Sequence, residues 1–328
     1  MQAIQLVAYS SPTGLVVVDL PEPAAPQPGE ALIEMEYAPV NLNDFVLAQG
    51  RYFLKPMLPA VIGTEGAGIV LALGDGVCNV AVGDRVTIPF GTFSWAQRLI
   101  VPAAGLFVVD PQIAAQQAAL LSIAPTTAAL LLDAFGVLPA GSWIAFNAAN
   151  SLVGRTLIAL AKARGYHVVA IVRRPELISE LKQLGADVVG LEDAALADQI
   201  HAATNGAAIT LAFDAVGGSS TGTLAKLVAP GGRILVYALT GGQPISADQF
   251  DLIAKNVSIY GFSMYRDPSK LAAATAEVAT LVANGQLDIA VARIFRPGQI
   301  SEAVDHLLHG RGKALIDFQV ATTRNSGT

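Results

Sequence analysis

Short apolar runs separated by Pro and Gly clusters dominate roughly the first 110 residues. The runs at Leu15–Asp19, 31–37 and 85–88 have the length of β-strands. The stretch 21–29 between two of them contains four prolines. Because proline fixes φ and cannot donate to a ladder, this stretch is predicted to be an extended connection. The pattern predicts a β-rich region.

After residue 142 the pattern changes to strands that alternate with helices, which is typical of a parallel sheet. Apolar runs this continuous favour strands buried on both faces. The predicted strands are Trp143–Phe146, His167–Val172, 187–189, 209–213, 234–237 and 258–260. Pro297 begins a loop and an amphipathic helix, a last strand is expected at 314–318, and residues 321–328 are expected to form a loose tail.

Composition limits the classes of protein that fit this pattern. The 328 residues are 53% hydrophobic and 14% charged, which excludes a disordered chain. Because single cores stop growing near ~250 residues, we expect two domains. The net charge is −6 without a run of Lys or Arg, which argues against a nucleic-acid partner.

The single cysteine, Cys78, allows no intramolecular disulfide and fits a reducing compartment, the cytoplasm. Residues 111–132 carry no charge, yet their glutamines, threonines and prolines argue against a membrane span. No membrane partner is expected.

A candidate phosphate-binding turn lies at 147–154, between the strand Trp143–Phe146 and a helical pattern. Such a turn presents backbone N–H groups to a pyrophosphate at the positive end of the helix. Only one of the three usual glycines is present, so an ordinary strand-to-helix loop is the alternative. The candidate residues are Asn147, Asn150, Ser151, Leu152, Val153 and Gly154.

The next strand ends in Arg173 and Arg174, where an NAD-binding unit would carry an acid for the ribose hydroxyls. A 2′-phosphate suits guanidinium groups, so the pair favours NADP(H) over NAD(H). A solvated basic loop is the alternative.

Five motifs now point to a family. They are Gly-Thr-Glu-Gly-Ala-Gly at 63–68, Val-Gly-Asp-Arg-Val at 82–86, Ala-Val-Gly-Gly at 215–218, Ala-Pro-Gly-Gly-Arg at 229–233 and Gly-Lys at 312–313. In this order and spacing the chain resembles the zinc-independent medium-chain dehydrogenases/reductases, the branch of quinone oxidoreductases and 2-enoyl thioester reductases.

The resemblance implies an α/β fold in which a GroES-like, β-rich catalytic domain is joined to a Rossmann domain with a doubly wound parallel sheet. It places the catalytic domain at 1–113 and 265–328, and the NADP-binding domain at 114–264. It also implies a homodimer joined through Rossmann-domain edges.

Two positions argue against a catalytic metal. The zinc-dependent relatives bind zinc through a Cys and a His, and this chain has Asn41 and Thr64 at those positions. Neither side chain matches a thiolate or an imidazole as a zinc ligand. No metal site is therefore predicted, and the expected substrate changes from an alcohol to an activated C=C bond or a quinone.

The resemblance also assigns site residues. Tyr52 matches the proton donor of the enoyl reductases, Asn41 a polar contact near the nicotinamide ribose and substrate, and Thr127 a contact to the nicotinamide amide. Residues that follow successive parallel strands are expected to line the cofactor cleft: Asp214, Ala215, Val216, Tyr237, Phe262 and Met264.

The sequence thus predicts an NADPH-dependent reductase of a small-molecule enoyl thioester or enone. Segment 147–154 resembles the enoyl reductases, whereas 63–68 is closer to the quinone reductases, so an NADPH:quinone oxidoreductase is the first alternative. A non-catalytic NADPH-binding protein is the second.

Overall fold

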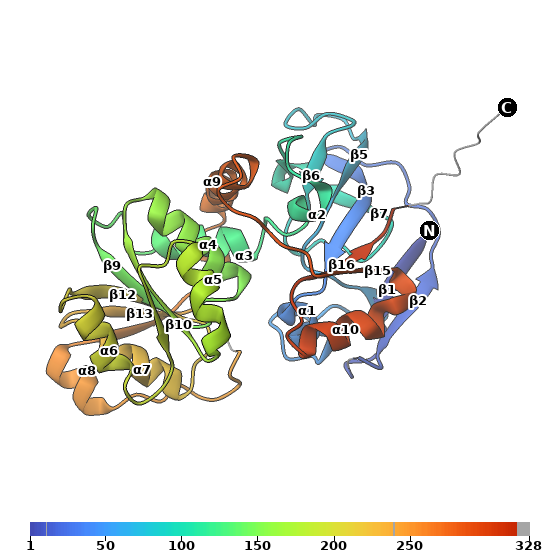
Figure 1. Ribbon diagram of the computed structural model, residues 1–328. Coiled ribbons are helices and arrows are strands. Elements are labelled where there is room, and N and C mark those ends of the chain that lie inside the picture. The colour runs from blue at the N-terminus through green and yellow to red at the C-terminus, as the bar shows by residue number, and fades with distance from the viewer. Residues whose placement is uncertain (11, 239, 320–328) are drawn as a thin grey trace. The chain divides into compact units, whose positions relative to one another are not determined.

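The computed structural model describes residues 1–10, 12–238 and 240–319, so the predicted tail at 321–328 lies outside the described residues. The chain forms two compact units, one of Met1–Ile123 with Asp288–Thr328 and one of Ala124–Leu287 (Figure 1). The first is β-rich and combines both chain ends, and the second contains a parallel sheet. This is the predicted α/β architecture.

The β-rich unit, which we call the catalytic unit, contains two sheets. In the described chain their strand orders are β2-β1-β4 and β15-β16-β3-β5-β6-β8, and β7 also pairs with β3. The strands are β1 Gln2–Leu6, β2 Leu15–Asp19, β3 Glu30–Pro39, β4 Ala60–Val61, β5 Ala67–Leu73, β6 Arg85–Thr87, β7 Arg98–Pro102, β8 Phe107–Val108, β15 Arg293–Phe295 and β16 Ala314–Asp317.

Strand β3 organises the larger sheet. Its positions alternate between half-buried and buried, which puts Ala31, Ile33 and Met35 in the core. Strand β16 pairs antiparallel with β3, and Ile316 lies opposite Ala38. The last described strand therefore completes a sheet that begins near the N-terminus, which is why both chain ends belong to one unit.

Short helices connect these strands. They are α1 Leu42–Ala48, η1 Ala103–Gly105, α2 Ala115–Ala118, η5 Pro297–Gln299 and α10 Ile300–Leu308. The amphipathic helix predicted after Pro297 is α10, which buries Ile300 and Val304.

The second unit, the Rossmann unit, holds a six-stranded sheet in the described chain, ordered β11-β10-β9-β12-β13-β14, with all five neighbouring pairs parallel. The strands are β9 Trp143–Phe146, β10 His167–Val172, β11 Val188–Leu191, β12 Ile209–Asp214, β13 Arg233–Val236 and β14 Ser258–Gly261. All six correspond to predicted strands, with ends shifted by at most two residues.

The helices of the Rossmann unit pack around this sheet. They are α3 Ala124–Leu132, α4 Leu152–Ala163, η2 Pro175–Leu177, α5 Ile178–Gln183, α6 Leu196–Ala203, α7 Ser219–Leu227, α8 Gln249–Lys255, η3 Met264–Arg266, η4 Pro268–Lys270 and α9 Leu271–Ala283. Helices α6, α7 and α8 lie together in Figure 1, away from α3 and α4. The strand order reverses between β9 and β12, and ligands of such sheets bind at that point, beyond the carboxyl ends of the strands.

The boundaries between the units differ from the predicted 113/114 and 264/265. Helix α2 packs against β3, β5 and β6 and belongs to the catalytic unit, whereas α9 packs against α3 and α4 and belongs to the Rossmann unit. The change of composition near residue 114 precedes the structural boundary, because the Ala-rich segment begins before the chain leaves the first core.

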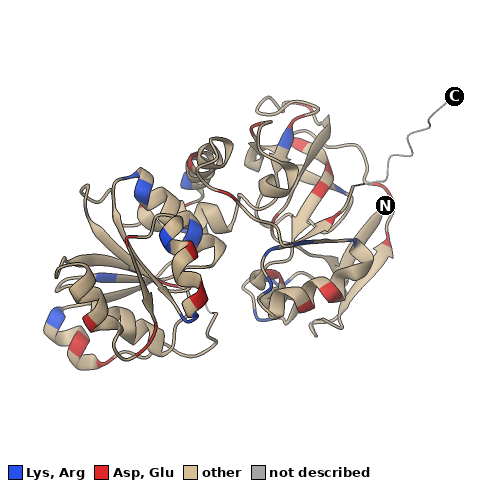
Figure 2. Ribbon diagram, viewed as in Figure 1, with Lys and Arg blue, Asp and Glu red and all other residues tan. Residues whose placement is uncertain are grey.

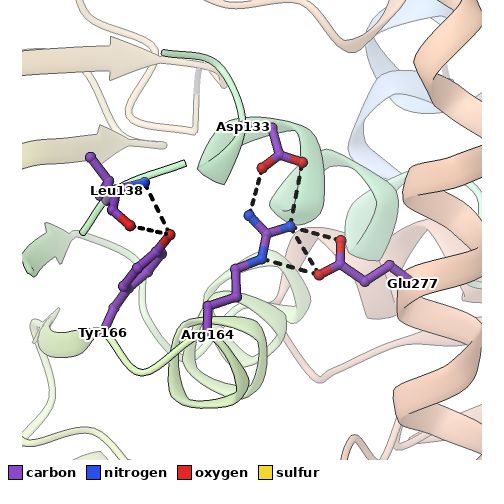
Figure 3. A network of polar contacts seen from close by, with 5 residues as sticks. All are labelled: Asp133, Leu138, Arg164, Tyr166 and Glu277. Atoms are coloured by element: carbon purple, nitrogen blue, oxygen red, sulfur yellow. Dashed lines mark hydrogen bonds and ion pairs between the residues drawn. The ribbon is translucent and has the colours of Figure 1, made fainter. Parts of the chain in front are cut away.

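Arg164 helps to hold α9 in the Rossmann unit (Figure 3). Its guanidinium group donates to Asp133 Oδ1 at 2.6 Å and to Glu277 Oε2 at 2.7 Å. Burial alone would lower the pKa of Arg164, but the hydrogen bonds to Glu277 and Asp133 outweigh it and raise the pKa. One side chain thus joins the end of α4 to the segment after α3 and to α9.

Charged residues of both signs are interspersed over the helices and loops (Figure 2). Among the described residues, no helix is both long and apolar enough to cross a membrane. The charge-free segment 111–132 is divided between α2 and α3.

Candidate active site

The first turn of α1 gathers polar residues of the catalytic unit. Asn41 precedes the helix, and its backbone N–H donates to Asp44 Oδ2 at 2.7 Å, as in a helix N-cap. Asn41 and Asp44 are 4% and 1% exposed. The local helix start therefore places an amide and a carboxyl group side by side in the interior.

Asp44 also binds Thr64, which the resemblance to the medium-chain dehydrogenases/reductases places at the position of a zinc-ligating histidine. Its Oδ1 accepts from Thr64 N at 2.8 Å and from Thr64 Oγ1 at 2.7 Å. Burial raises the pKa of Asp44 to about 6, while the hydrogen bonds from Thr64 and Asn41 oppose that shift. Asp44 is therefore mostly ionised at neutral pH and uses its charge to hold Thr64.

Glu65 and Lys313 fix the Asn41 side chain from two sides. Asn41 Nδ2 donates to Glu65 Oε2 at 3.0 Å, and Lys313 Nζ donates to Asn41 Oδ1 at 2.8 Å. Burial raises the pKa of Glu65 and lowers that of Lys313, and the opposite charges of the two groups reduce both shifts. The amide of Asn41 can consequently adopt only one orientation.

Tyr52 follows α1 and lies half-buried beside Phe53, with 4.3 Å between the ring centroids. Burial raises the pKa of its phenol to about 12, the nearby Asn43 side chain opposes this rise, and the charge of Asp44 adds to it. A phenol with this pKa stays protonated at neutral pH and remains a proton donor. Asn41, one of the two predicted catalytic residues, contacts Asp44 directly, and the charge of Asp44 acts on the other, Tyr52.

The candidate phosphate-binding turn is a tight connection from β9 to α4. Ser151 caps α4, and its Oγ accepts from Gly154 N at 3.1 Å. A Cβ on Gly154 would lie 2.4 Å from the carbonyl oxygen of Ala149, so only glycine fits there. Ala148 adopts a φ of 48°, in the left-handed region that glycine would favour. Leu152, Val153 and Gly154 form the first turn of α4, and Asn150 O accepts from Arg155 Nε.

Asn147 joins this turn to the end of β12. Its Nδ2 donates to Asp214 Oδ1 at 2.6 Å and to Ser220 Oγ at 2.9 Å, and its Oδ1 accepts from Ala215 N at 2.7 Å. Asp214 accepts in addition from Val216 N. Because the amide is occupied by the protein, we interpret Asn147 as a residue that orders the carboxyl edge of the sheet.

Arg173 and Arg174 have different surroundings. Arg173 lines a cavity of about 600 Å³ with Glu192, Val216 and Lys226. Arg174 lies 3.8 Å from Glu176 in an exposed ion pair. The first arginine is therefore better placed to meet a ligand in the cavity.

The remaining predicted cofactor residues follow β13 and β14 or belong to α3. Thr127 Oγ1 donates to Met264 Sδ at 3.3 Å, and both residues are buried. Burial raises the pKa of the Tyr237 phenol, the charge of Asp214 adds to this, and the nearby Ser151 side chain opposes it. Phe262 N donates to Val236 O. Residues that are distant in the sequence thus gather along the carboxyl edge.

Sequence reasoning missed four polar residues of these two clusters. Asn43 and Lys313 contact Thr64 and Asn41 in the catalytic unit, and Glu192 and Lys226 line the cavity of the Rossmann unit. The Gly-Lys motif at 312–313 and the polar run at 41–44 were signals for the first two. Lys226 lies in α7, and nothing in the local pattern distinguishes it from a surface lysine.

Comparison with known proteins decides the family. Residues 27–106 match the family model of the alcohol dehydrogenase GroES-like domain, and residues 153–280 match that of the zinc-binding dehydrogenases. The mitochondrial enoyl-acyl-carrier-protein reductase of Caenorhabditis elegans is 35% identical over 247 residues, which cover 74% of this chain and 70% of that protein. The chain belongs to the medium-chain dehydrogenase/reductase family. It is an oxidoreductase with a dinucleotide-binding domain.

Solved structures of medium-chain dehydrogenases/reductases share the whole fold. Quinone oxidoreductase of Pseudomonas syringae has a TM-score of 0.85 and 26% identity, and the match covers 96% of this chain and 99% of that one. A mutant form of enoyl thioester reductase from Candida tropicalis has a TM-score of 0.84 at 22% identity, and the match covers 96% and 99% of the two chains. At 22% identity, the similarity to the Candida tropicalis protein shows the fold alone.

The residues of this medium-chain dehydrogenase/reductase do not fit the zinc ion that one family name implies. Asn41 and Thr64 offer an amide and a hydroxyl group, and the ammonium group of Lys313 already binds the amide oxygen of Asn41. Across the described ranges, no three His, Cys, Asp or Glu side chains form a group that could hold a metal. A cationic side chain lies where a metal would need an electron-pair donor.

Proposed function

We propose that this chain is an NADPH-dependent, zinc-independent reductase of an activated carbon–carbon double bond, in a 2-enoyl thioester or an enone. The observation that carries the proposal is the state of Tyr52. Its phenol is half-buried beside the ring of Phe53, and burial and the charge of nearby Asp44 raise its pKa to about 12. Such a group donates a proton in the neutral pH range without losing it to solvent.

The relatives support the substrate class. The protein from Caenorhabditis elegans is named as a reductase of enoyl groups on acyl carrier protein, and it shares 35% identity with this chain. The presence of Asn41, Thr64 and Lys313 in place of a zinc site supports the same class. Without a metal to stabilise an alkoxide, a double bond activated by a thioester is a more suitable substrate than an alcohol.

The Rossmann unit supports NADPH as the reductant. Arg173 and Lys226 bring two cations to the cavity at its carboxyl edge, and Ser151 caps the helix that follows the turn. In this proposal the N-terminus of α4 receives the pyrophosphate and Arg173 receives the 2′-phosphate. Val216, Tyr237, Phe262, Met264 and Thr127 would line the remainder of the dinucleotide site.

In the proposed reaction, bound NADPH supplies the hydride that the β carbon of the double bond accepts. Negative charge then develops as an enolate, which needs a proton at the α carbon. Tyr52 donates this proton through its phenol O–H. Asn41, oriented by Glu65 and Lys313, offers an uncharged polar contact to the substrate and the nicotinamide ribose.

Reduction of quinones is the second candidate function. The solved quinone oxidoreductase of Pseudomonas syringae matches almost the whole chain, and segment 63–68 resembles the quinone reductases. A quinone also accepts hydride without a metal. Reduction of a quinone depends less on a proton donor held beside one particular carbon atom. The effect of replacing Tyr52 therefore distinguishes the two functions.

A substrate panel with one variant tests the proposal. The purified protein should oxidise NADPH with a 2-enoyl-CoA, and Tyr52→Phe should lower kcat about 100-fold, the scale of general acid catalysis, with little change in NADPH affinity. Faster turnover of quinones, unaffected by Tyr52→Phe, would establish the second function instead. NADPH binding without turnover of enones, quinones and enoyl thioesters would indicate a non-catalytic binding protein.

The homodimer and the cytoplasmic location stay predictions. The edge strand β14 and the exposed side chains of Phe250 and Ile253 on α8 support an interface on the Rossmann unit. Light scattering on the purified chain would report the mass in solution.

A further inference from the structure

Glu192 is a carboxylate in the cavity that also contains the arginine proposed to receive the 2′-phosphate. It follows β11, and its backbone N–H donates to Val172 O at 2.9 Å, so it lies beside Arg173 at the carboxyl ends of two paired strands. Both residues line the cavity of the Rossmann unit. A ligand in this cavity therefore meets a cation and an acceptor on neighbouring strands.

Glu192 is anchored by a series of hydrogen bonds whose directions are fixed. Asn147 Oδ1 accepts from Ala215 N, so its NH₂ group faces the other way and donates to Ser220 Oγ at 2.9 Å. The single hydrogen of the Ser220 hydroxyl group is then donated to Glu192 Oε1. A polar side chain at position 192 must therefore present an acceptor to Ser220.

The second carboxylate oxygen of Glu192 is the part that a ligand can use. In the described chain no donor is hydrogen-bonded to Glu192 Oε2, and the residue is only half-buried. Leu196, Ala197 and Val216 add apolar side chains to the same lining, which suits the faces of an aromatic ring. A carboxylate oxygen accepts hydrogen bonds and donates none, so the ligand group beside it must carry N–H or O–H hydrogens.

The order of the strands indicates which ring this is. Along the carboxyl edge the turn at 147–154 follows β9, Arg173 follows β10 and Glu192 follows β11, and these strands are neighbours in the sheet, roughly 4.8 Å apart. NADPH has its groups in a corresponding order: pyrophosphate, ribose with its 2′-phosphate, and adenine. With the pyrophosphate at the turn and the 2′-phosphate at Arg173, the adenine comes to the end of β11.

We propose that Glu192 is a specificity-determining residue that accepts a hydrogen bond from the 6-amino group of the adenine ring. The inference rests on the proposed function, because it assumes that NADPH occupies this cavity. Guanine and hypoxanthine carry an oxo group at the same ring position, and its lone pairs would face the carboxylate. Glu192 thereby selects the adenine dinucleotide, while Arg173 selects its phosphate.

The test compares the binding of NADPH with that of its hypoxanthine analogue, in which an oxo group replaces the 6-amino group. Fluorescence of the reduced nicotinamide reports both Kd values without turnover. The wild type should bind NADPH about 10- to 100-fold more tightly than the analogue, the effect of one hydrogen bond to a charged group. Glu192→Leu has no acceptor and should abolish this preference.

Glu192→Gln gives a sharper test, and it provides the answer if Glu192→Leu does not fold. Ser220 still needs an acceptor, so the amide oxygen turns toward Ser220 and the NH₂ group turns toward the ligand. The variant should therefore bind the hypoxanthine analogue more tightly than NADPH, which reverses the wild-type order. Loss of charge alone would change both affinities without reversing their order.

Asp193→Asn is the matched control. Asp193 lines the same cavity and carries the same charge, but its Oδ1 accepts from Ala195 N at 2.9 Å. The substitution removes one negative charge from the lining, so both Kd values should change by a similar factor and their ratio should stay that of the wild type. A ratio that reverses as in Glu192→Gln would show that charge, and not a directed hydrogen bond, produces the preference.

The inference is overturned if the wild type binds both dinucleotides equally, or if Glu192→Gln keeps the wild-type ratio. Arg173→Ala separates this failure from that of the proposed function. If Arg173→Ala weakens NADPH binding and the ratio does not respond to Glu192, this inference alone fails and the proposed cofactor site stands. If Arg173→Ala leaves NADPH binding unchanged, the placement of NADPH in this cavity fails and this inference fails with it.

Discussion

Lys313 and Asn41 are 272 residues apart in the sequence, and Lys313 Nζ lies 2.8 Å from Asn41 Oδ1. The contact is possible because β16 follows Lys313 directly and pairs with the end of β3, which precedes Asn41. It brings an ammonium group to the amide oxygen of Asn41. The charge of Lys313 thereby stabilises the buried carboxylate of Glu65, and its hydrogen bond fixes the orientation of the Asn41 amide.

Removal of the Lys313 ammonium group should destabilise the folded protein. Lys313→Met should lower the free energy of unfolding by about 1.5–3 kcal/mol, the value of a hydrogen bond to a charged group, because Asn41 loses its donor and Glu65 loses its counter-charge. Adding Glu65→Gln should recover part of the loss, since the uncharged side chain no longer needs a cation. Urea denaturation of the four proteins measures the coupling, and strictly additive losses would contradict the electrostatic link.

Asp44 should make stability depend on pH. Its pKa is about 6 in the folded protein and 3.8 ordinarily, so the folded state binds this proton more tightly than the unfolded state. The contribution of Asp44 to stability is therefore greatest below pH 3.8 and is lost as the pH rises to about 6. At about 1.4 kcal/mol per unit of pKa, the change is roughly 3 kcal/mol.

Asp44→Asn lacks this titration. The free energy of unfolding of the variant relative to that of the wild type should therefore rise between pH 4 and pH 7. Chemical denaturation across this range measures the difference, and a difference that stays constant or falls with pH would contradict it.

The two arginines after β10 should differ in their effect on cofactor choice. Arg173→Ala should weaken NADPH binding by about 10- to 100-fold, because a charge-assisted contact to the 2′-phosphate is lost, and should leave NADH binding nearly unchanged. Arg174→Ala is the matched control with a smaller effect, since Arg174 is paired with Glu176 outside the cavity lining. Fluorescence titration with both cofactors measures the affinities. Equal losses of affinity for NADPH and NADH would show that Arg173 does not recognise the 2′-phosphate.

The candidate phosphate-binding turn at 147–154 should gain stability from a glycine at Ala148. Ala148 has a φ of 48°, a conformation that costs a residue with a Cβ about 1 kcal/mol. Ala148→Gly should therefore raise the Tm by a few degrees. Ala149→Gly is the control, because buried Ala149 is not among the residues with positive φ and should lose stability on substitution. A lower Tm for Ala148→Gly would contradict the argument.

Much of the fold could be predicted because it rests on local patterns. The six strands of the parallel sheet are continuous apolar runs, and their ends differ from the prediction by at most two residues. The boundaries between the units were harder to predict from the sequence. Helix α9 belongs to the Rossmann unit because it packs on α3 and α4 and because Glu277 contacts Arg164. No local sequence pattern shows against which of the two cores a helix packs.

The sequence by itself determined the order of strands and helices along the chain, the tight connection at 147–154 and the amide and hydroxyl side chains at Asn41 and Thr64. Those features depend on residue type and spacing along the chain. Only the tertiary structure separated Arg173 from Arg174, brought Lys313 to Asn41 and linked Asn43 to Thr64. The reason is physical: orientation, burial and pKa depend on neighbours that sheet pairing and loop packing bring from distant segments.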